Sequence, residues 1–111
     1  MDNSKDYKYY INKILEDISF ILDSIKWKEL GDFEDDVFLN NAVCFRFIQI
    51  SENANKIPIS VRQKYSQISW HKVSGLRNRI VHDYGSIQLD IIYNTIINDL
   101  PRLAEELKRI T

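Results

Sequence analysis

The sequence predicts an all-α fold, in which residues 1–111 form one domain built as a bundle of four to five helices. Two observations support this prediction. Over long segments, apolar residues recur at the three- and four-residue spacing of one helix face. The 3 glycines and 2 prolines are too few for the turns of a many-stranded sheet. A length of 111 residues suits one domain with one hydrophobic core.

Two long helices are expected in the N-terminal half. The first carries one apolar stripe and should stop at Gly31, beside Asp32. A second is expected from about Asp35 to Ile57, ending before Pro58. Because it is apolar over a broad arc, we expect it to be well buried. The first stripe is Ile11, Ile14, Leu15, Ile18, Ile21, Leu22 and Ile25, and the broad arc is Val37, Phe38, Ala42, Phe45, Ile48 and Ile50.

Shorter elements are expected in the middle of the chain. The segment from Ile59 to Tyr65 fits a single helical turn after a proline. Ser69 is well placed to cap a helix that runs from Trp70 to about Tyr84, and Gly85 is a natural breaker at its end.

The last helix is expected to open at Ser86 or Asp90. Pro101 lies inside its apolar pattern and should bend the helix, because proline removes an intrahelical hydrogen bond. The pattern is Leu89, Ile92, Tyr93, Ile96, Leu100, Leu103, Leu107 and Ile110.

Composition narrows the setting in which this chain works. No apolar run approaches the roughly 18 residues that cross a bilayer, and the first six residues are polar and acidic, unlike a signal peptide. A single cysteine, Cys44, excludes an internal disulfide and suits a reducing compartment. We therefore expect a cytoplasmic protein without membrane association, with Cys44 as a buried small hydrophobe.

The charge of the chain is balanced overall but unevenly distributed. The net charge is −1, yet none of the 16 acidic residues lies between Asn53 and His82. A basic segment in a neutral protein can attract phosphate, although the same run is also compatible with ordinary solvated side chains. The segment contains Lys56, Arg62, Lys64, Lys72, Arg77 and Arg79.

Several familiar chemistries are excluded. Two histidines and one cysteine without i, i+3 or i+4 spacing make a zinc site unexpected. The chain has no glycine-rich phosphate loop and no Gly-x-Ser-x-Gly elbow. We expect neither a metal nor a cofactor.

One short segment concentrates groups that metal-free phosphodiester cleavage requires. It contains Arg77, Asn78, His82 and Tyr84 within eight residues. A histidine of near-neutral pKa can move the proton of a ribose 2′-hydroxyl, and an arginine can hold the non-bridging phosphate oxygens. The alternative is that these side chains only pair with the last carbonyls of a helix and with acids such as Asp83.

The spacing within this segment raises a geometric question. Arg77 and His82 are five residues apart, which is roughly 140° around a regular helix. Either the helix distorts, or long side chains reach around it, or a second copy completes the site. A two-fold dimer places the same segment opposite itself.

Other candidate residues have two interpretations each. Glu52 falls on an apolar line of the second helix, where it either supports a site or points to water at an exposed helix end. Trp27, Phe33 and Trp70 could stack on RNA bases, but such aromatics are more often core residues. His71, beside Trp70, fits a surface or packing residue better than a second catalyst.

At this point the residues resemble a known family. Arg77-Asn78-x-x-x-His82-x-Tyr84 resembles the Arg-x4-His-x-Tyr motif of HepT-like proteins, the toxins of type VII-like HEPN/MNT toxin–antitoxin pairs. The likeness includes the opening helix and covers nearly the whole chain in the same order. Outside the motif it rests on Ala42-Val43, Ile48-x-Ile50-Ser51-Glu52-x-Ala54, Ile68-Ser69-Trp70 and Asp99-Leu100-Pro101-x-Leu103.

The resemblance implies an HEPN-like fold and a role for each matched residue. Arg77 and His82 would be the catalytic pair of a metal-independent endoribonuclease acting on mRNA or tRNA. Asn78 and Glu52 would support the site. Tyr84 would accept AMP from a partner nucleotidyltransferase antitoxin, which silences the toxin. The family further implies a homodimer whose two motifs face a shared cleft.

Two further points accompany the resemblance. Ser51 stands where many HepT-like proteins have glycine, and its hydroxyl needs room. Lys72 and Arg79 would contact flanking RNA phosphates, with Arg79 also supporting the site. The competing functions are a non-enzymatic dimeric module that docks the nucleotidyltransferase or binds RNA without cutting it, and a structural subunit in which Arg77 and His82 are inaccessible.

Overall fold

The computed structural model describes residues 6–81 and 88–111, and every regular element within them is a helix. The predicted all-α bundle is confirmed. Long helices are separated by short ones, because glycine, proline and capping residues interrupt the apolar pattern. The described helices are α1 (Tyr7–Ser24), α2 (Leu30–Asp35), α3 (Val37–Asn55), α4 (Ile59–Lys64), α5 (Trp70–Ser74), α6 (Leu76–Val81), α7 (Leu89–Asn98) and α8 (Leu100–Lys108).

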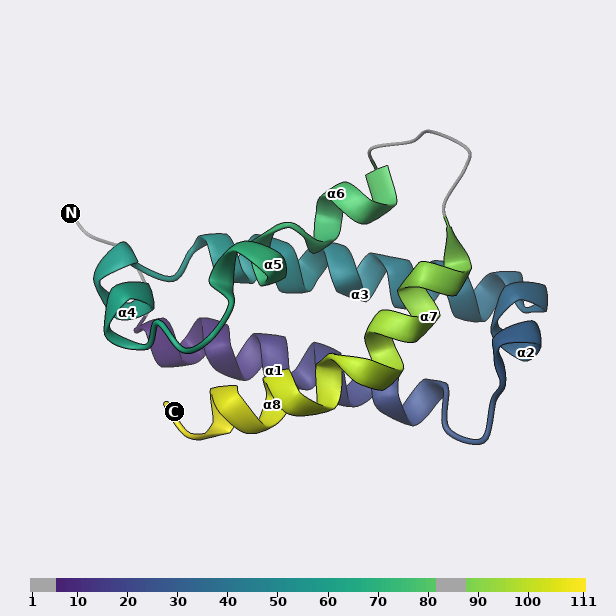
Figure 1. The fold of residues 1–111 in the computed structure, drawn as a ribbon, viewed down its shortest axis with the longest axis horizontal. Coiled ribbons are helices and arrows are strands. Elements are labelled where there is room, and N and C mark those ends of the chain that lie inside the picture. The colour runs from purple at the N-terminus through teal and green to yellow at the C-terminus, as the bar shows by residue number, and fades with distance from the viewer. Residues whose placement is uncertain (1–5, 82–87) are drawn as a thin grey trace.

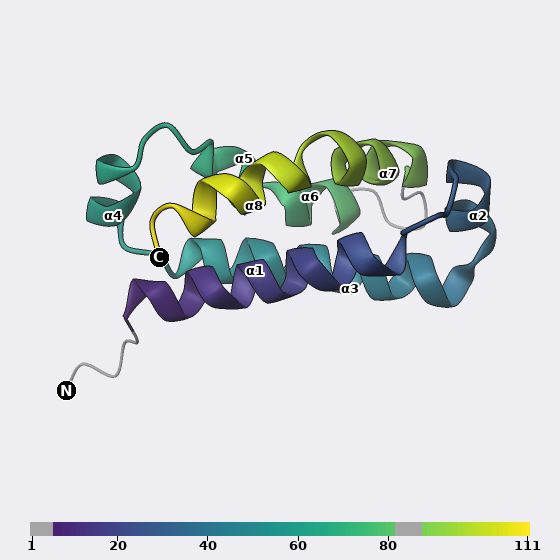
Figure 2. The same ribbon diagram turned by 90° about the horizontal axis from the view of Figure 1, so that it is seen from below.

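The helices form two layers (Figures 1 and 2). The antiparallel pair α1 and α3 makes one layer, and α5 to α8 make the other. Helices α2 and α4 lie at opposite ends of the molecule. The Tyr7 hydroxyl donates a hydrogen bond to the Ile110 carbonyl over 3.4 Å, which joins the start of α1 to the end of the chain. None of the described helices is long and apolar enough to cross a membrane.

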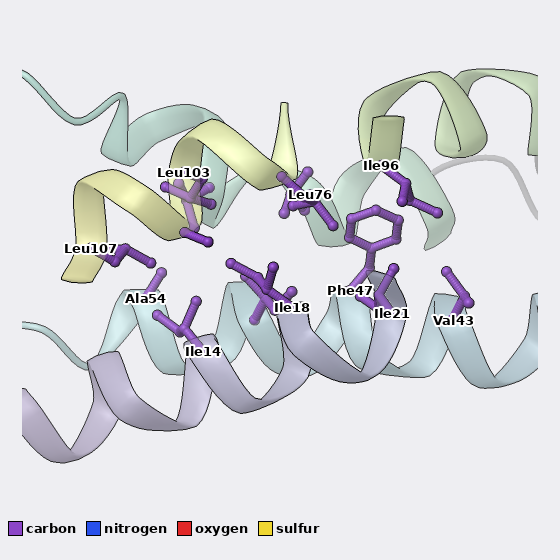
Figure 3. Packing of buried hydrophobic residues seen from close by; sticks show 14 of the residues in the cluster. Ile14, Ile18, Ile21, Val43, Phe47, Ala54, Leu76, Ile96, Leu103 and Leu107 are labelled. Atoms are coloured by element: carbon purple, nitrogen blue, oxygen red, sulfur yellow. The ribbon is translucent and has the colours of Figure 1, made fainter. Parts of the chain in front are cut away.

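The hydrophobic core lies between the two layers (Figure 3). Ile14 and Ile18 of α1 point from one layer toward Leu103 and Leu107 of α8 in the other. Leu76 of α6 enters the same core, so the helix that carries Arg77 is anchored by an apolar side chain. Burying a leucine or isoleucine contributes about 2 kcal/mol. Most of the expected stripes of the first and last helices therefore form the core, and Leu15, Leu22, Leu89 and Tyr93 pack against it partly buried.

The first helix ends earlier than expected. Helix α1 stops at Ser24, and Gly31 lies inside α2 rather than acting as a stop. The carboxylate of Asp32 accepts a hydrogen bond of 2.9 Å from the backbone N–H of Glu29, which is one half of a helix-starting box. Asp32 thus opens a new helix at the place where the glycine indicated an end.

The prediction of a well-buried second helix is wrong for one face of α3. Phe38 is 91% exposed, and Val37 and Phe45 are exposed with it. The face packed on α1, α5 and α6 instead carries Val43, Cys44, Phe47, Ile50, Ser51 and Ala54. A bundle of this size covers one stripe of the helix, and the broad apolar arc extends beyond it.

The helix expected from Trp70 to about Tyr84 is divided at Gly75 into α5 and α6. A Cβ atom on Gly75 would lie 3.0 Å from the carbonyl oxygen of His71, so a side chain there would require the backbone to move. The Ser51 hydroxyl, fully buried on α3, donates a hydrogen bond to the Ser74 carbonyl at this break. The Ser69 side chain makes no capping hydrogen bond.

The bend predicted at Pro101 is confirmed. The last apolar pattern is divided at Asp99 into α7 and α8, and Pro101 lies in the first turn of α8. Proline is tolerated there because the N–H groups of the first turn have no intrahelical acceptor. The predicted opening at Ser86 and the breaker at Gly85 lie outside the described residues, and α7 begins at Leu89, one residue before the alternative opening at Asp90.

An ion pair with a buried carboxylate joins the two helices of the first layer. Arg46 of α3 donates a hydrogen bond of 2.9 Å to the carboxylate of Asp17 on α1, whose side chain is 5% exposed. The Arg46 guanidinium also lies 4.0 Å from the centroid of the Phe20 ring. Burial raises the pKa of Asp17, and the hydrogen bond and charge of Arg46 oppose that rise only in part.

We therefore expect Arg46→Ala to destabilise the fold by about 3 kcal/mol at pH 7, because it leaves the Asp17 carboxylate buried without a partner. The raised pKa of Asp17 means that the folded state binds a proton there more tightly than the unfolded chain. The loss should therefore shrink as the pH is lowered toward 4. Urea denaturation at both pH values measures it.

The matched control is Asp17→Asn in the Arg46→Ala background, which removes the stranded charge while keeping the shape. This double variant should recover most of the lost stability. If Arg46→Ala costs the same stability in the wild type and in the Asp17→Asn protein, Arg46 acts through its packing on Phe20 and not through Asp17.

Candidate functional site

The candidate site lies on α6, which contains the first residues of the motif. Arg77 and Asn78 are exposed on this helix, whereas Leu76 and Ile80 on either side are buried. The helix is thus held by two apolar side chains and presents a guanidinium and an amide to solvent. His82 and Tyr84 lie outside the described residues. The exposure of Arg77 contradicts what a purely structural subunit predicts for that residue.

Glu52 is exposed on α3, in agreement with an acid that points to water. Within residues 6–81 and 88–111, no hydrogen bond or ion pair joins it to another residue. Its proposed support of the site remains a prediction. The adjacent Ser51 has the observed contact, because its hydroxyl holds the Ser74 carbonyl next to α6. A serine in place of glycine is thus accommodated by a hydrogen bond.

Lys72 and Arg79, the expected phosphate contacts, line one pocket of about 360 Å³ between α5–α6 and α7–α8. Both side chains belong to exposed residues. Arg77 and Asn78, on the same short helix as Arg79, do not line it. The structure therefore brings two of the expected cations together and places Arg77 on a different face of α6.

Arg79 is fixed in that pocket by a residue that the sequence did not single out. Its Nη1 donates a hydrogen bond of 3.0 Å to the hydroxyl of Thr95 on α7. Thr95 is buried, and its hydroxyl donates in turn to the Ile91 carbonyl over 2.9 Å. The hydroxyl proton is therefore committed to Ile91, so the oxygen is free to accept from arginine. One guanidinium N–H is thereby used, and within residues 6–81 and 88–111 no further hydrogen bond or ion pair occupies the others.

The basic segment is part structural and part exposed. Arg62 donates hydrogen bonds of 3.0 Å to the carbonyls of Ile57 and Asn55, so it satisfies the end of α3 instead of facing a ligand. Lys56, Lys64, Lys72, Arg77 and Arg79 are exposed. Five cations of the segment are therefore exposed, one fewer than the sequence count, and they lie at the end of α3 and on α4, α5 and α6.

The remaining candidates divide between core and surface. Phe33 and Trp70 are buried, as expected, and the Trp70 indole donates to the Tyr65 carbonyl over 3.1 Å. Trp27 is 94% exposed, so its expected place in the core is wrong; it lies in the connection between α1 and α2 with a positive φ of 65°. His71 is exposed.

Cys44 is buried as predicted, and burial raises the pKa of its thiol, so it remains protonated and unreactive. Within the described residues, no three His, Cys, Asp or Glu side chains gather as metal ligands.

Comparison with known proteins gives a family for this arrangement. The model of the Ribonuclease HepT-like family matches residues 11–110. "Gamma-glutamylcyclotransferase and putative RNase MJ0434" of Methanocaldococcus jannaschii is 34% identical over 96% of this chain, which spans only 48% of that relative.

Two relatives are similar in length to this chain. "Putative RNase TTE0752" of Caldanaerobacter subterraneus is 29% identical over 91% of this chain and 90% of its own. "Probable ribonuclease HepT" of Thermococcus cleftensis is 23% identical over 96% of each. No solved structure matches significantly. Because the family match begins at the first core residue of α1 and extends to the end of α8, this chain belongs to the Ribonuclease HepT-like family.

Proposed function

We propose that this chain is a metal-independent endoribonuclease that cleaves mRNA or tRNA, and that it is the cytoplasmic toxin of an HEPN/MNT toxin–antitoxin pair. The observation that carries the proposal is the presentation of Arg77. The first motif residue lies exposed on a helix that is anchored by Leu76 and Ile80, next to further cations and within a family named for a ribonuclease.

The chemistry follows from the side chains in the motif. His82 removes the proton of a ribose 2′-hydroxyl, and the oxygen attacks the adjacent phosphorus. The bond to the 5′-oxygen breaks, and that oxygen takes a proton from an acid, the role left for His82 of a second copy. The products carry a 2′,3′-cyclic phosphate and a 5′-hydroxyl. Arg77 stabilises the charge that builds on the phosphate oxygens.

A homodimer is part of the proposal. Two observations support it. The spacing of Arg77 and His82 is poorly suited to a compact site on one regular helix, and a two-fold axis supplies a second set of groups. In addition, Phe38 and Phe45 leave an apolar face of α3 open to water, and exposed apolar patches mark interaction surfaces. A second copy that covers this face would remove the free-energy cost of exposing these apolar side chains to water.

Regulation would occur at Tyr84. Transfer of AMP by a nucleotidyltransferase antitoxin places bulk and negative charge two residues from His82, which repels the RNA backbone and obstructs the site. Lys72 and Arg79 hold flanking phosphates of the substrate. Their exposed cationic ends favour this role, and the hydrogen bond from Arg79 to Thr95 orients one of them.

The second candidate is a dimeric module that docks the antitoxin or binds RNA without cutting it. The exposed cations on α4 to α6 would serve either function, since electrostatic attraction of RNA does not require cleavage. The two candidates differ in whether RNA integrity depends on His82.

We expect wild-type protein to cleave RNA in the presence of EDTA, and His82→Ala to lose at least 100-fold in rate, because general acid–base catalysis contributes about 10²–10⁴. Gel analysis of total RNA and tRNA measures this, and circular dichroism confirms that the variant remains helical. Cleavage that survives His82→Ala would refute the assignment. A folded, unmodified wild type that cuts nothing would favour the binding module.

We expect Tyr84→Phe to remain active and to resist neutralisation by the nucleotidyltransferase and ATP, because the phenol oxygen that accepts AMP is missing. Intact-mass spectrometry should show an added adenylyl group on the wild type only. Tyr9→Phe is the matched control, since Tyr9 is an exposed tyrosine on α1, outside the motif. If Tyr84→Phe is silenced as readily as wild type, Tyr84 is not the regulatory residue.

A further inference from the structure

The pocket between α5–α6 and α7–α8 has a composition that the cleavage chemistry does not explain. Its volume of about 360 Å³ lies near the lower end of the roughly 300–1,000 Å³ typical of small-molecule sites. It lies within the second layer, where Figure 1 shows α5 and α6 on one side and α8 and α7 on the other.

The floor of the pocket is apolar and belongs to the hydrophobic core. Val73, Leu76, Leu100 and Leu103 line it, and each is a buried member of the hydrophobic core. A preformed apolar floor favours a flat, partly apolar group, because burying that group displaces water without ordering the protein. The planar face of a nucleobase meets this requirement, whereas a bare phosphate does not.

The rim of the pocket is cationic on both sides. Lys72 and Arg79 come from the α5–α6 side, and Arg102 comes from α8. Arg102 lies 3.7 Å from Asp99, an exposed pair that is worth little in water and yields readily to a stronger anion. Together with Arg79, which Thr95 orients, these groups can hold the phosphate attached to a base that lies on the floor.

The remaining polar groups indicate which bases fit. Glu106 of α8 is half-buried in the lining, and within the described part of the chain it makes no ion pair. A carboxylate accepts hydrogen bonds only, so it favours the exocyclic amino group of cytosine, adenine or guanine over uracil, whose base offers the single N3–H between two carbonyl oxygens. Ser69 and Gln67 add a hydroxyl and an amide to the same pocket.

We propose that this pocket holds one unpaired nucleotide of the RNA strand, and that it prefers a base with an exocyclic amino group over uracil. The inference rests on the proposed ribonuclease function and adds a specificity subsite to it. RNA is commonly read through unpaired bases that are splayed out of the strand. A paired base could not reach the apolar floor, so the substrate must be single-stranded at this position.

The held nucleotide is a neighbour of the scissile link and not the one that is cut. Leu76 and Arg79 of α6 line the pocket, whereas Arg77 on the same helix does not. Different faces of one helix are separated by about 10 Å, the diameter of a helix with its side chains. The strand therefore passes from the pocket around α6 to Arg77.

The test measures, by fluorescence anisotropy, how tightly the protein binds hexanucleotides whose 2′-O-methyl groups prevent cleavage. Hexacytidylate should bind wild type at least fivefold more tightly than hexauridylate, and Glu106→Gln should reduce this preference below twofold. Ser69→Trp, which fills the pocket from its exposed rim, should weaken hexacytidylate at least tenfold. Ser66→Trp adds the same indole to the same connection outside the pocket and should bind like wild type, as should Arg109→Ala.

The outcomes separate this inference from the ribonuclease proposal. Unchanged hexacytidylate binding by Ser69→Trp would overturn the pocket, even if unmodified RNA is still cut. Loss of binding in a protein that cuts no RNA would support the pocket and contradict cleavage. Free CMP that binds as tightly as hexacytidylate would overturn an RNA subsite in favour of a mononucleotide site. Equal binding of both hexanucleotides by wild type would overturn the base preference.

Discussion

The close contact between α3 and the break at Gly75 is the constraint on which the site depends. Because Gly75 has no Cβ atom, the chain can pass close to the His71 carbonyl. The buried Ser51 hydroxyl donates a hydrogen bond to the adjacent Ser74 carbonyl. A buried carbonyl without a partner costs about 1–3 kcal/mol, so this hydrogen bond makes the break favourable. It also sets where α6 begins and therefore where Arg77 is presented.

The two faces of α6 therefore have different roles. Leu76 and Ile80 are buried and hold the helix against the core. Arg79 is held by Thr95 of α7 at the rim of a pocket, whereas Arg77 is exposed outside it. A helix of six residues would be unstable alone, and its packing against α3 supplies the order that a precise guanidinium position needs.

Much of the fold could be predicted from apolar spacing, because a stripe such as Ile11 to Ile25 has only one way to face a core. The predictions failed where local signals compete. Gly31 indicated a stop, but the Asp32 carboxylate started a helix. Phe38 and Phe45 indicated burial, but a small bundle covers only one side of α3.

The motif residues could be identified by their chemistry and resemblance, whereas their supports could not. Ser51 and Ser74 are 23 residues apart in sequence, and Arg79 and Thr95 are 16 apart. No spacing rule connects such pairs, because tertiary packing alone brings them together. The pocket was missed for the same reason: its floor is made of core residues, and its rim is made of surface residues from the α5–α6 side and from α8.

In the proposed mechanism, Arg77 stabilises the phosphate oxygens during cleavage. The single-turnover cleavage rate of a defined RNA in EDTA by wild type, Arg77→Ala and Arg77→Lys measures this role. We predict a fall of about 10²–10³ for Arg77→Ala, nearly unchanged RNA affinity, and partial recovery with lysine. A rate for Arg77→Ala within twofold of wild type would show that Arg77 does not act on the phosphate.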